Sequence, residues 1–244
     1  MKLAIISDIH SNLEALEAVL EDLQDQSVES IYCLGDLVGY AANPNEVIDL
    51  LWHNRVKCMI GNHDYACLNQ HAMDELIRNA REAIAFTKRV LTPESYSFLK
   101  EMPRMISENG IFLTHGMPPA LFDEYLDMQS AFELKQGFSS FPEQVAFVGH
   151  THLFEVVELT DNGKIEKYEF DGFKLDMKPT SRYLISAGSV GQPRDDNREA
   201  GYLIFDTDIQ QVIKLTIQYN VELTIEKIKA AGLPEVNGKR LLKE

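Results

Sequence analysis

The sequence predicts an α/β protein, and two features of the chain lead to this prediction. The first 65 residues alternate short apolar runs with helical patterns, which is typical of parallel strands joined by helices. After His152 the pattern changes to short strand-like runs separated by turn signals, which predicts an antiparallel second sheet. A chain of 244 residues can bury a sizeable core, so we assign residues 1–244 to a single domain.

The first strand and helix are expected near the start of the chain. Residues 3–7 are apolar and suit a strand. The next apolar residues recur at spacings of three and four, which indicates a helix with one buried face. They are Leu13, Leu16, Leu20 and Leu23. Ser11 and Glu14 have the spacing of a capping box and are expected to begin this helix.

Further helices are predicted downstream of a second strand near residues 30–34. The segment Asn43-Pro44-Asn45-Glu46 suits a helix start, with Asn43 as the cap, Pro44 in the first turn and Glu46 completing a capping box. Residues 72–91 and 93–101 have helical spacing. We expect residues 69–103 to form a small helical cap insertion beside the site described below.

The chain after His152 reads mainly as strands. The strand-like runs are FEVVEL, KIEKYEF, RYLISAGS, GYLIFD and QQVIKLTIQY. Asp161-Asn162-Gly163 between the first two is a good hairpin turn, since glycine accepts a positive φ. The pattern of residues 222–231 predicts a final short helix. The last eight residues, NGKRLLKE (237–244), are expected to form a polar tail.

Short polar motifs directly follow five of the apolar runs, namely LAIISDIH (3–10), IYCLGD (31–36), CMIGNHD (58–64), IFLTHG (111–116) and VAFVGHTH (145–152). Five of the seven histidines fall in these motifs. In an α/β sheet, functional loops stand at the carboxyl ends of strands. The candidate metal ligands there are Asp8, His10, Asp36, Asn62, His115, His150 and His152. Carboxylate, amide and imidazole together suit Mn²⁺, Fe, Zn²⁺ or Co²⁺, and the lack of thiolate disfavours Cu(I) or an iron–sulfur cluster.

The order DxH, GD, GNHD, THG and GHTH resembles the calcineurin-like metallophosphoesterases, which are hydrolases with a two-metal centre. The downstream SAGSVGQPRD (186–195) is similar to the small bacterial and archaeal branch that includes the YfcE-type phosphodiesterases. This resemblance covers most of the chain. It implies a fold of two mainly mixed β-sheets packed as a sandwich and flanked by helices.

The resemblance also implies a role for each motif. One ion would be bound by Asp8, His10, Asp36 and His152, and the other by Asp36, Asn62, His115 and His150. Asp36 would bridge two divalent ions, with Mn²⁺ the first choice. A hydroxide bridging the ions is the expected nucleophile. His63 would donate a proton to the leaving group or stabilise its charge, and Asp64 would orient that imidazole.

Other polar residues keep two interpretations at this stage. Tyr40 follows the GD motif and either touches substrate or packs in the loop. Arg194 and Ser189 either contact phosphate or brace the GHTH loop. His53 and His71 match no motif and are expected at the surface. The cysteines lack CxxC spacing, and Cys33 and Cys58 lie in apolar runs, so we expect small core residues and no disulfide.

Composition narrows the range of partners. The net charge of −15 disfavours binding to long nucleic acid. It is compatible with a small anionic substrate, because two divalent cations would outweigh the charges of two carboxylate ligands. No apolar run is long enough to span a membrane, and the start MKLAIISDIH is too short for a secretory signal, so we expect a cytoplasmic location.

The leading functional hypothesis is hydrolysis of a phosphoester bond. The branch resemblance favours phosphodiesters, with nucleotides and dinucleoside polyphosphates as close competitors. A phosphomonoesterase, such as a Ser/Thr protein phosphatase, ranks third. A non-catalytic scaffold, like the retromer subunit that resembles this fold, is the alternative of another class. It predicts losses among the ligands, whereas this chain retains all seven together with His63 and Asp64.

Overall fold

The computed structural model describes residues 1–119, 122, 124–170, 172–196 and 198–242. Its strands are β1 Lys2–Ile6, β2 Ser30–Cys33, β3 Lys57–Cys58, β4 Met105–Glu108, β5 Ile111–Thr114, β6 Val145–Val148, β7 Glu155–Leu159, β8 Ile165–Glu169, β9 Lys174–Asp176, β10 Arg182–Ser186, β11 Ala200–Asp206 and β12 Gln211–Ile217. Its helices are α1 Leu13–Asp25, α2 Pro44–His53, α3 Asn62–Leu68, α4 Gln70–Glu75, α5 Arg78–Val90, α6 Pro93–Glu101, α7 Ala131–Ser139, α8 Val221–Ala230 and α9 Glu235–Lys239.

The first sheet has the strand order β3-β2-β1-β11-β12-β9. Strands β1, β2 and β3 are parallel, as the alternating pattern predicts, whereas β11 pairs antiparallel with β1. The prediction that the strand-like runs after His152 form a separate sheet is therefore wrong for β11 and β12. Strand β9, which has no counterpart among the predicted strands, pairs with β12 in the same sheet. The pairing has a packing reason, because Phe205 and Leu203 of β11 lie opposite Leu3 and Ile5 and extend the same apolar face.

The second sheet has the order β4-β5-β6-β10-β7-β8 and is mixed rather than antiparallel. Strands β5, β6 and β10 are parallel, β7 pairs antiparallel with β10, and β8 pairs antiparallel with β7 at the edge of the sheet. The hairpin predicted at residues 161–163 is confirmed, since it joins β7 to β8 and Gly163 adopts a φ of 78°.

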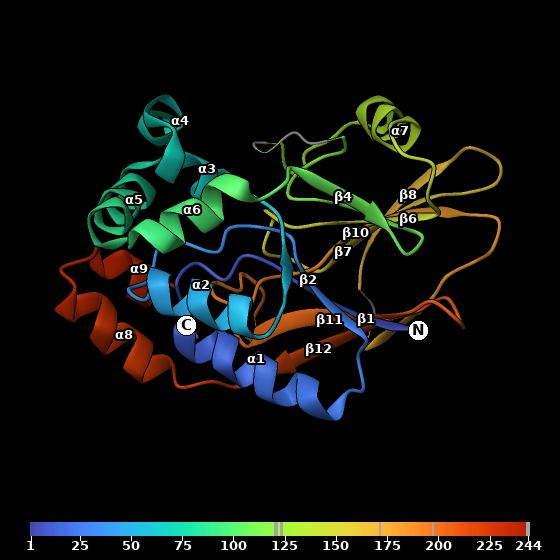
Figure 1. Cartoon of the computed structure of the whole chain (residues 1–244). Coiled ribbons are helices and arrows are strands. Elements are labelled where there is room, and N and C mark those ends of the chain that lie inside the picture. Colours follow the sequence, from blue (N-terminus) through green and yellow to red (C-terminus); the bar gives the residue numbers. More distant parts are fainter. Residues whose placement is uncertain (120–121, 123, 171, 197, 243–244) are drawn as a thin grey trace.

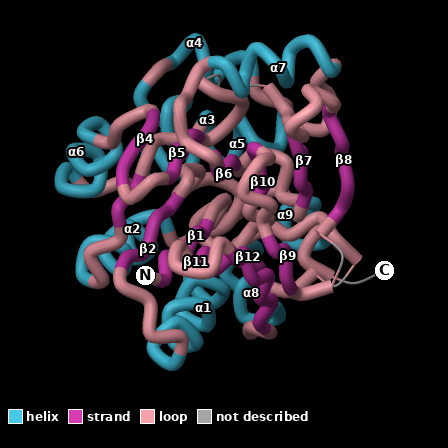
Figure 2. The backbone as a smooth tube through the Cα atoms, turned by 90° about the vertical axis from the view of Figure 1, so that its right-hand side faces the viewer, coloured by secondary structure: helices cyan, strands magenta, loops and turns pink. Residues whose placement is uncertain are grey.

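The two sheets pack face to face and are covered by helices on their outer sides (Figures 1 and 2). An apolar core between them draws residues from both sheets, including Ile5, Phe147, Tyr183 and Phe205. A second core lies between the first sheet and helices that include α1 and α2, and a third lies between the second sheet and α7. The predicted fold class, two mixed sheets flanked by helices, is confirmed.

Helix α1 begins one residue later than a Ser11–Glu14 capping box would place it, so that prediction is wrong. Asn12 is the N-cap, and its Oδ1 accepts a hydrogen bond from the Ala15 N–H at 3.2 Å. Ser11 has a left-handed backbone (φ 59°), and its hydroxyl instead accepts the Gly39 N–H at 3.2 Å. The Glu14 carboxylate pairs with Lys227 of α8.

Asn12 joins three segments of the fold, and its replacement by alanine is expected to be destabilising. Besides capping α1, its Nδ2 donates to the Gly191 carbonyl at 2.9 Å, and its Oδ1 accepts from Thr224 Oγ1 at 3.1 Å. We expect Asn12→Ala to lower the free energy of unfolding by about 1–3 kcal/mol, from the lost cap and one unsatisfied buried group. Urea unfolding followed by circular dichroism measures this change.

Asn43 provides the matched control for this variant. It is the N-cap residue of α2, but within the described structure its side chain makes no capping bond and donates to Glu46 Oε1 at 3.1 Å, in an exposed position. The predicted capping box at Glu46 is thus not formed, although Pro44 does open the helix. Asn43→Ala should cost less than about 0.5 kcal/mol. Equal effects of the two variants would contradict the role given to Asn12.

The helical insertion differs from the prediction in one respect. Residues 72–91 are not one helix, because Leu76 and Ile77 are extended (ψ 148° and 153°) and separate α4 from α5. Helix α6 lies at residues 93–101 as predicted. Helix α8 matches the predicted final helix, but the expected polar tail is partly packed, since it contains the end of α9 and the buried Asn237. Residues 243–244 of that tail lie outside the described residues.

Candidate metal centre

The structure brings all seven predicted ligand residues to the carboxyl ends of five strands. Asp8 and His10 follow β1, Asp36 follows β2, and Asn62 opens α3 just after β3. His115 follows β5, and the two remaining histidines follow β6. The carboxyl ends of strands from both sheets therefore face one common site, although these strands are far apart in the sequence.

A left-handed backbone conformation is shared by five of these residues. They are Asp8 (φ 54°), His10 (φ 52°), Asp36 (φ 55°), His150 (φ 70°) and His152 (φ 62°). A positive φ at a residue other than glycine costs of order 1 kcal/mol and persists only where the surroundings impose it. Here the Asp8 N–H donates to the Gly35 carbonyl at 3.0 Å, and the His10 N–H to the Asp36 carbonyl at 2.9 Å. The surrounding hydrogen bonds thus hold unfavourable backbone conformations that direct these side chains into the site.

Three histidine rings are held in one tautomer by backbone carbonyls. The Nδ1 atoms lie 3.2 Å from the Val38 oxygen for His10, 3.0 Å from the Leu34 oxygen for His115, and 2.6 Å from the Gln192 oxygen for His152. A carbonyl can only accept, so each Nδ1 must donate. In its neutral form, a ring that donates from Nδ1 directs the lone pair of its Nε2 into the site, which is the arrangement typical of metal-binding histidines.

Several acceptor atoms consequently face one another. The Nε2 atoms of His10 and His152 are 3.2 Å apart, and His115 Nε2 is 3.0 Å from Asn62 Oδ1. Asp8 Oδ1 and His150 Nε2 are buried without a hydrogen-bond partner among the described residues. Opposed lone pairs and unsatisfied buried acceptors are unfavourable unless a cation lies between them.

Three groups of side chains offer ligand atoms that lie within 4.8 Å of one another. Two consist of predicted ligands, namely Asp8, His10 and His152, and Asp36, His115 and His150, and these are the two ligand clusters. The third group joins His10 and Asp36 to His63. Asp36 Oδ2 lies between the two ligand clusters, 3.7 Å from His10 Nε2 and 3.5 Å from His115 Nε2. These donor sets fit two divalent cations, with Asp36 positioned for both.

The buried carboxylates of this site lack positive partners in the described part of the chain, where neither Asp8 nor Asp36 has a lysine or arginine within 4.0 Å. Burial raises the pKa of Asp36, and the negative charges of Asp8 and Asp64 raise it further. Burial also opposes ionisation of Asp8, but the positive charge that His152, His115 and His10 carry when protonated outweighs burial and holds the pKa of Asp8 low. Bound cations would supply the missing positive charge.

His63 lies beside the two clusters rather than within a predicted ligand set. Its ring is 5% exposed and lies 4.7 Å, centroid to centroid, from the rings of both His10 and Tyr40. A Cβ on Gly39 would stand 2.5 Å from His63 Nδ1, so only glycine leaves room for this imidazole. Burial, with the nearby His152 and His115, lowers the pKa of His63 to about 3, so the ring is neutral at pH 7.

Asp64 does not orient the His63 ring, and that prediction is wrong. Its Oδ1 accepts the Val38 N–H at 3.1 Å and its Oδ2 accepts the Gly61 N–H at 3.0 Å. The two side chains are neighbours at the start of α3 and so point about 100° apart around its axis. Asp64 therefore ties the loop after β2 to the start of α3, and in the described structure His63 Nδ1 has no hydrogen-bond partner.

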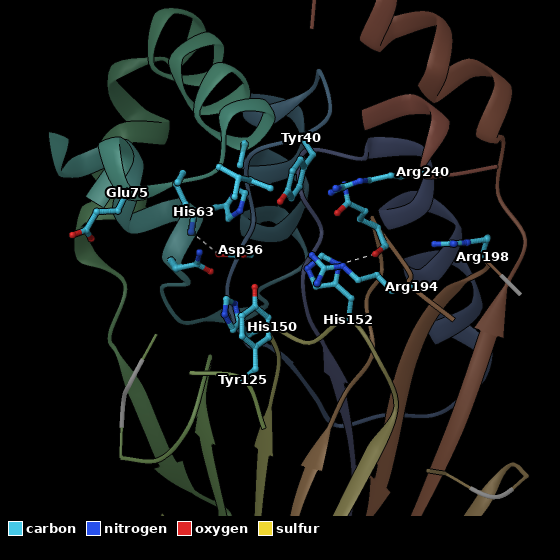
Figure 3. Close-up of a pocket in the computed structure, with 15 residues that line it drawn as sticks. Asp36, Tyr40, His63, Glu75, Tyr125, His150, His152, Arg194, Arg198 and Arg240 are labelled. Atoms are coloured by element: carbon cyan, nitrogen blue, oxygen red, sulfur yellow. Dashed lines mark hydrogen bonds between the residues drawn. The ribbon is translucent and has the colours of Figure 1, made fainter. Parts of the chain in front are cut away.

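A cavity of about 610 Å³ opens over the site (Figure 3). Asp36, Asn62, His63, His150 and His152 contribute to its lining. Its other walls come from the loop after β2, the α4–α5 junction and three arginines, and they include Tyr40, Tyr125, Glu75, Leu76, Ile77, Ala80, Gln192, Arg194, Arg198 and Arg240. The cap predicted beside the site thus contributes directly to this cavity.

The structure also decides among the remaining candidates. Tyr40 and Arg194 both line the cavity. Ser189 braces the loop, because its hydroxyl donates to the Asp8 carbonyl at 2.8 Å and accepts the Gln192 N–H at 2.9 Å. Tyr125 was not identified from the sequence, since it belongs to no motif, yet its ring stacks on His150 with centroids 4.0 Å apart.

The residues expected to lie away from the site do so. His53 and His71 are exposed. Cys33, Cys58 and Cys67 are buried free thiols. No helix among the described residues is long and apolar enough to cross a membrane.

Fold and site together define a two-sheet α/β protein with a buried carboxylate–imidazole centre. Residues 1–210 match the calcineurin-like phosphoesterase superfamily domain, and the chain belongs to this superfamily. The superfamily predicted from the motifs is therefore confirmed.

Full-length relatives agree with this assignment. The chain is 36% identical to the uncharacterized protein MJ0912 of Methanocaldococcus jannaschii, covering 98% of this chain and 96% of that protein. It is 33% identical to a metallophosphoesterase from Sphaerobacter thermophilus of known crystal structure, with a TM-score of 0.84 and coverage of 100% and 99%. The hypothetical protein PH1004 from Pyrococcus horikoshii shares the fold at 21% identity, with a TM-score of 0.81 and coverage of 99% and 98%.

Proposed function

We propose that the protein is a dinuclear-metal-dependent phosphoesterase that hydrolyses phosphodiesters, with nucleotides and dinucleoside polyphosphates as the next substrate classes. The observation that carries this proposal is the pair of acceptor clusters that meet at Asp36 Oδ2 on the floor of the cavity. Buried acceptor atoms that face one another are stabilised by cations bound between them. A centre with two cations is suited to phosphoryl transfer.

The proposed ligand sets are those that the family resemblance implies, and the geometry of the clusters supports them. Asp8, His10 and His152 would hold one ion, Asn62, His115 and His150 the other, and Asp36 both. Mn²⁺ is the first choice, because mixed oxygen and imidazole ligands suit it, with Fe, Zn²⁺ and Co²⁺ as alternatives. Two such ions would lower the pKa of a water molecule and neutralise phosphoryl oxygens.

The chain's own residues would assist the departure of the leaving group. Hydrolysis joins the oxygen of water to phosphorus and breaks the phosphorus–oxygen bond to the leaving group, whose oxygen must then gain a proton. His63 lines the cavity and is the proposed donor. The free ring is neutral, but a phosphate anion bound beside it would raise the pKa of His63, because an opposite charge favours the protonated imidazole.

The walls of the cavity would position the substrate. Tyr40 packs against His63 and His10 and is the proposed contact on one side, and Arg194 is the proposed phosphate contact on the other. Their placement supports catalysis over a scaffold role, because an open cavity of about 610 Å³ joins His63 to the ligand clusters. The proposed partner is a small phosphorylated molecule.

A panel of four substrates with added Mn²⁺ tests this function by kcat/KM. We expect bis(p-nitrophenyl) phosphate to be hydrolysed most efficiently, followed by ATP and diadenosine tetraphosphate, with p-nitrophenyl phosphate slowest. A monoester preferred over the diester would support the phosphomonoesterase alternative. Failure to hydrolyse any of the four, with metal bound, would overturn the proposal in favour of a scaffold.

A further inference from the structure

Three arginine side chains line one part of the cavity that holds the proposed metal centre. Arg194 and Arg198 come from the loop between β10 and β11, and Arg240 comes from the end of the chain just after α9. Figure 3 shows the three on one side of the cavity, with His63 and Glu75 on the other. Residues more than forty positions apart in the sequence thus contribute positive charge to a single wall.

None of these three guanidinium groups has a carboxylate within 4.0 Å among the described residues, unlike Arg78, which pairs with Glu82. What distinguishes them is that all three line one cavity, in a chain with 38 acidic and 23 basic residues. Unpaired guanidinium groups in a partly enclosed site favour an anion with several acceptor oxygens.

Arg240 is held in place by contacts specific to the C-terminal segment, which lies beyond the matched family region of residues 1–210. The buried Asn237 donates from Nδ2 to the Tyr40 carbonyl at 3.0 Å and accepts at Oδ1 from Asn79 of α5 at 3.1 Å. Leu241 and Leu233 pack with Ala41 and Ala83. These contacts fix Arg240 against both the Tyr40 loop and the cap.

The arginines also lie near groups of the proposed centre. Arg194 and Arg240 line the same cavity as Tyr40, whose ring packs against His10 and His63. Arg198 is oriented by its own loop, because its Nη1 donates to the Pro193 carbonyl at 3.0 Å. Its remaining side-chain N–H groups have no hydrogen-bond partner among the described residues and are available to a ligand.

From this arrangement we propose that Arg194, Arg198 and Arg240 form a second anion-binding subsite, and that the substrate is a phosphoester bearing a second phosphate group. This proposal rests on the proposed function, since the scissile phosphate is taken to lie at Asp36 and His63. The apolar surface of Leu76, Ile77 and Ala80 in the same cavity would receive the uncharged part of that substrate.

Two chromogenic substrates differing only in a remote phosphate test this subsite. They are the p-nitrophenyl ester of thymidine 5′-phosphate and the same ester with an additional 3′-phosphate. We expect the Mn²⁺-loaded protein to prefer the doubly phosphorylated ester at least about tenfold in kcat/KM. Arg240→Gln should reduce that preference about tenfold, the scale expected for losing one hydrogen bond to a charged group. Arg198→Gln should act in the same direction.

Lys239→Gln is the matched control, because it removes the same charge one residue away. Lys239 is 73% exposed and pairs with Glu235, so its loss should leave the preference unchanged. Arg240→Lys should restore part of the preference, which a purely structural defect would not. Thermal unfolding confirms that each variant is folded.

The outcomes separate this proposal from the proposed function. Hydrolysis of both esters with equal kcat/KM would overturn the subsite and leave the hydrolase intact. If neither ester is hydrolysed, calorimetric titration with thymidine 3′,5′-bisphosphate and with thymidine 5′-phosphate decides the subsite independently. Tighter binding of the bisphosphate that is lost in Arg240→Gln supports it, and equal affinities overturn it.

Discussion

Asp36→Asn is expected to lose bound metal and hydrolytic activity together. Asp36 Oδ2 lies between the two ligand clusters, 3.7 Å from His10 Nε2 and 3.5 Å from His115 Nε2. Asparagine preserves the size of the side chain, so the hydrogen bond that Oδ1 accepts from the His63 N–H at 2.8 Å can be retained. What is lost is the negative charge shared by two cations, worth several kcal/mol in the transition state, so kcat/KM should fall by about 10³-fold or more.

Bound metal and hydrolysis rate should be measured on the same Asp36→Asn preparation, because the prediction is that both are lost together. Asp49→Asn removes the same charge from an exposed position on α2 and should leave both bound metal and rate unchanged. An Asp36→Asn protein that retained two tightly bound ions and most of its activity would show that Asp36 does not bridge the centre.

His63→Ala is expected to separate metal binding from turnover. The ring lines the cavity and comes within 4.8 Å of ligand atoms of His10 and Asp36, but the variant retains all seven predicted ligands, so bound metal should stay in place. Loss of a positioned proton donor typically costs about 10²- to 10⁴-fold in rate. The loss should be largest for an alkyl leaving group and small for p-nitrophenolate, which departs without a proton.

The dependence on the leaving group is the decisive part of this second prediction. His53→Ala, at an exposed position, is the control and should behave like the unmodified protein. Equal losses of rate for the alkyl and p-nitrophenyl substrates would show that His63 acts in positioning or metal binding rather than as the proton donor. An unchanged rate on the alkyl ester would show that His63 has no role in the mechanism.

The strand-end motifs could be located from the sequence because their geometry is local. Each polar motif directly follows an apolar run, and parallel strands bring such ends together whatever the rest of the chain does. The predicted ligands, His63 and the cavity position of Tyr40 follow from that single rule. The parallel order of β1, β2 and β3 follows from the alternating pattern for the same reason.

Long-range pairing and orientation could not be predicted in this way. Nothing near β11 indicates that it pairs with β1 rather than with β10, because that choice depends on matching apolar faces about 200 residues apart. The direction of the Asp64 side chain depends on where α3 begins, and the N-cap role of Asn12 on the left-handed turn at Ser11. The direction of the Asp64 side chain and the choice of N-cap thus each depend on the conformation of one or two residues.

The C-terminal segment illustrates the same point for the cavity. Composition favours a polar tail, yet Asn237 is 1% exposed and bonds to the Tyr40 carbonyl. Arg240 enters the cavity only because that contact and the packing of Leu241 fold the segment back. Arg194 is recognisable from its place in the SAGSVGQPRD run, whereas Tyr125 and Arg240 carry no signal in the sequence.

The central claim is that two metal ions at the strand ends are required for phosphoester hydrolysis. The most direct measurement removes metal with a chelator, returns Mn²⁺ in steps, and records bound Mn²⁺ together with hydrolysis of bis(p-nitrophenyl) phosphate. We expect two ions per chain at saturation, with activity rising as the second ion binds. Undiminished hydrolysis by the chelated protein, or no hydrolysis with two ions bound, would contradict the account.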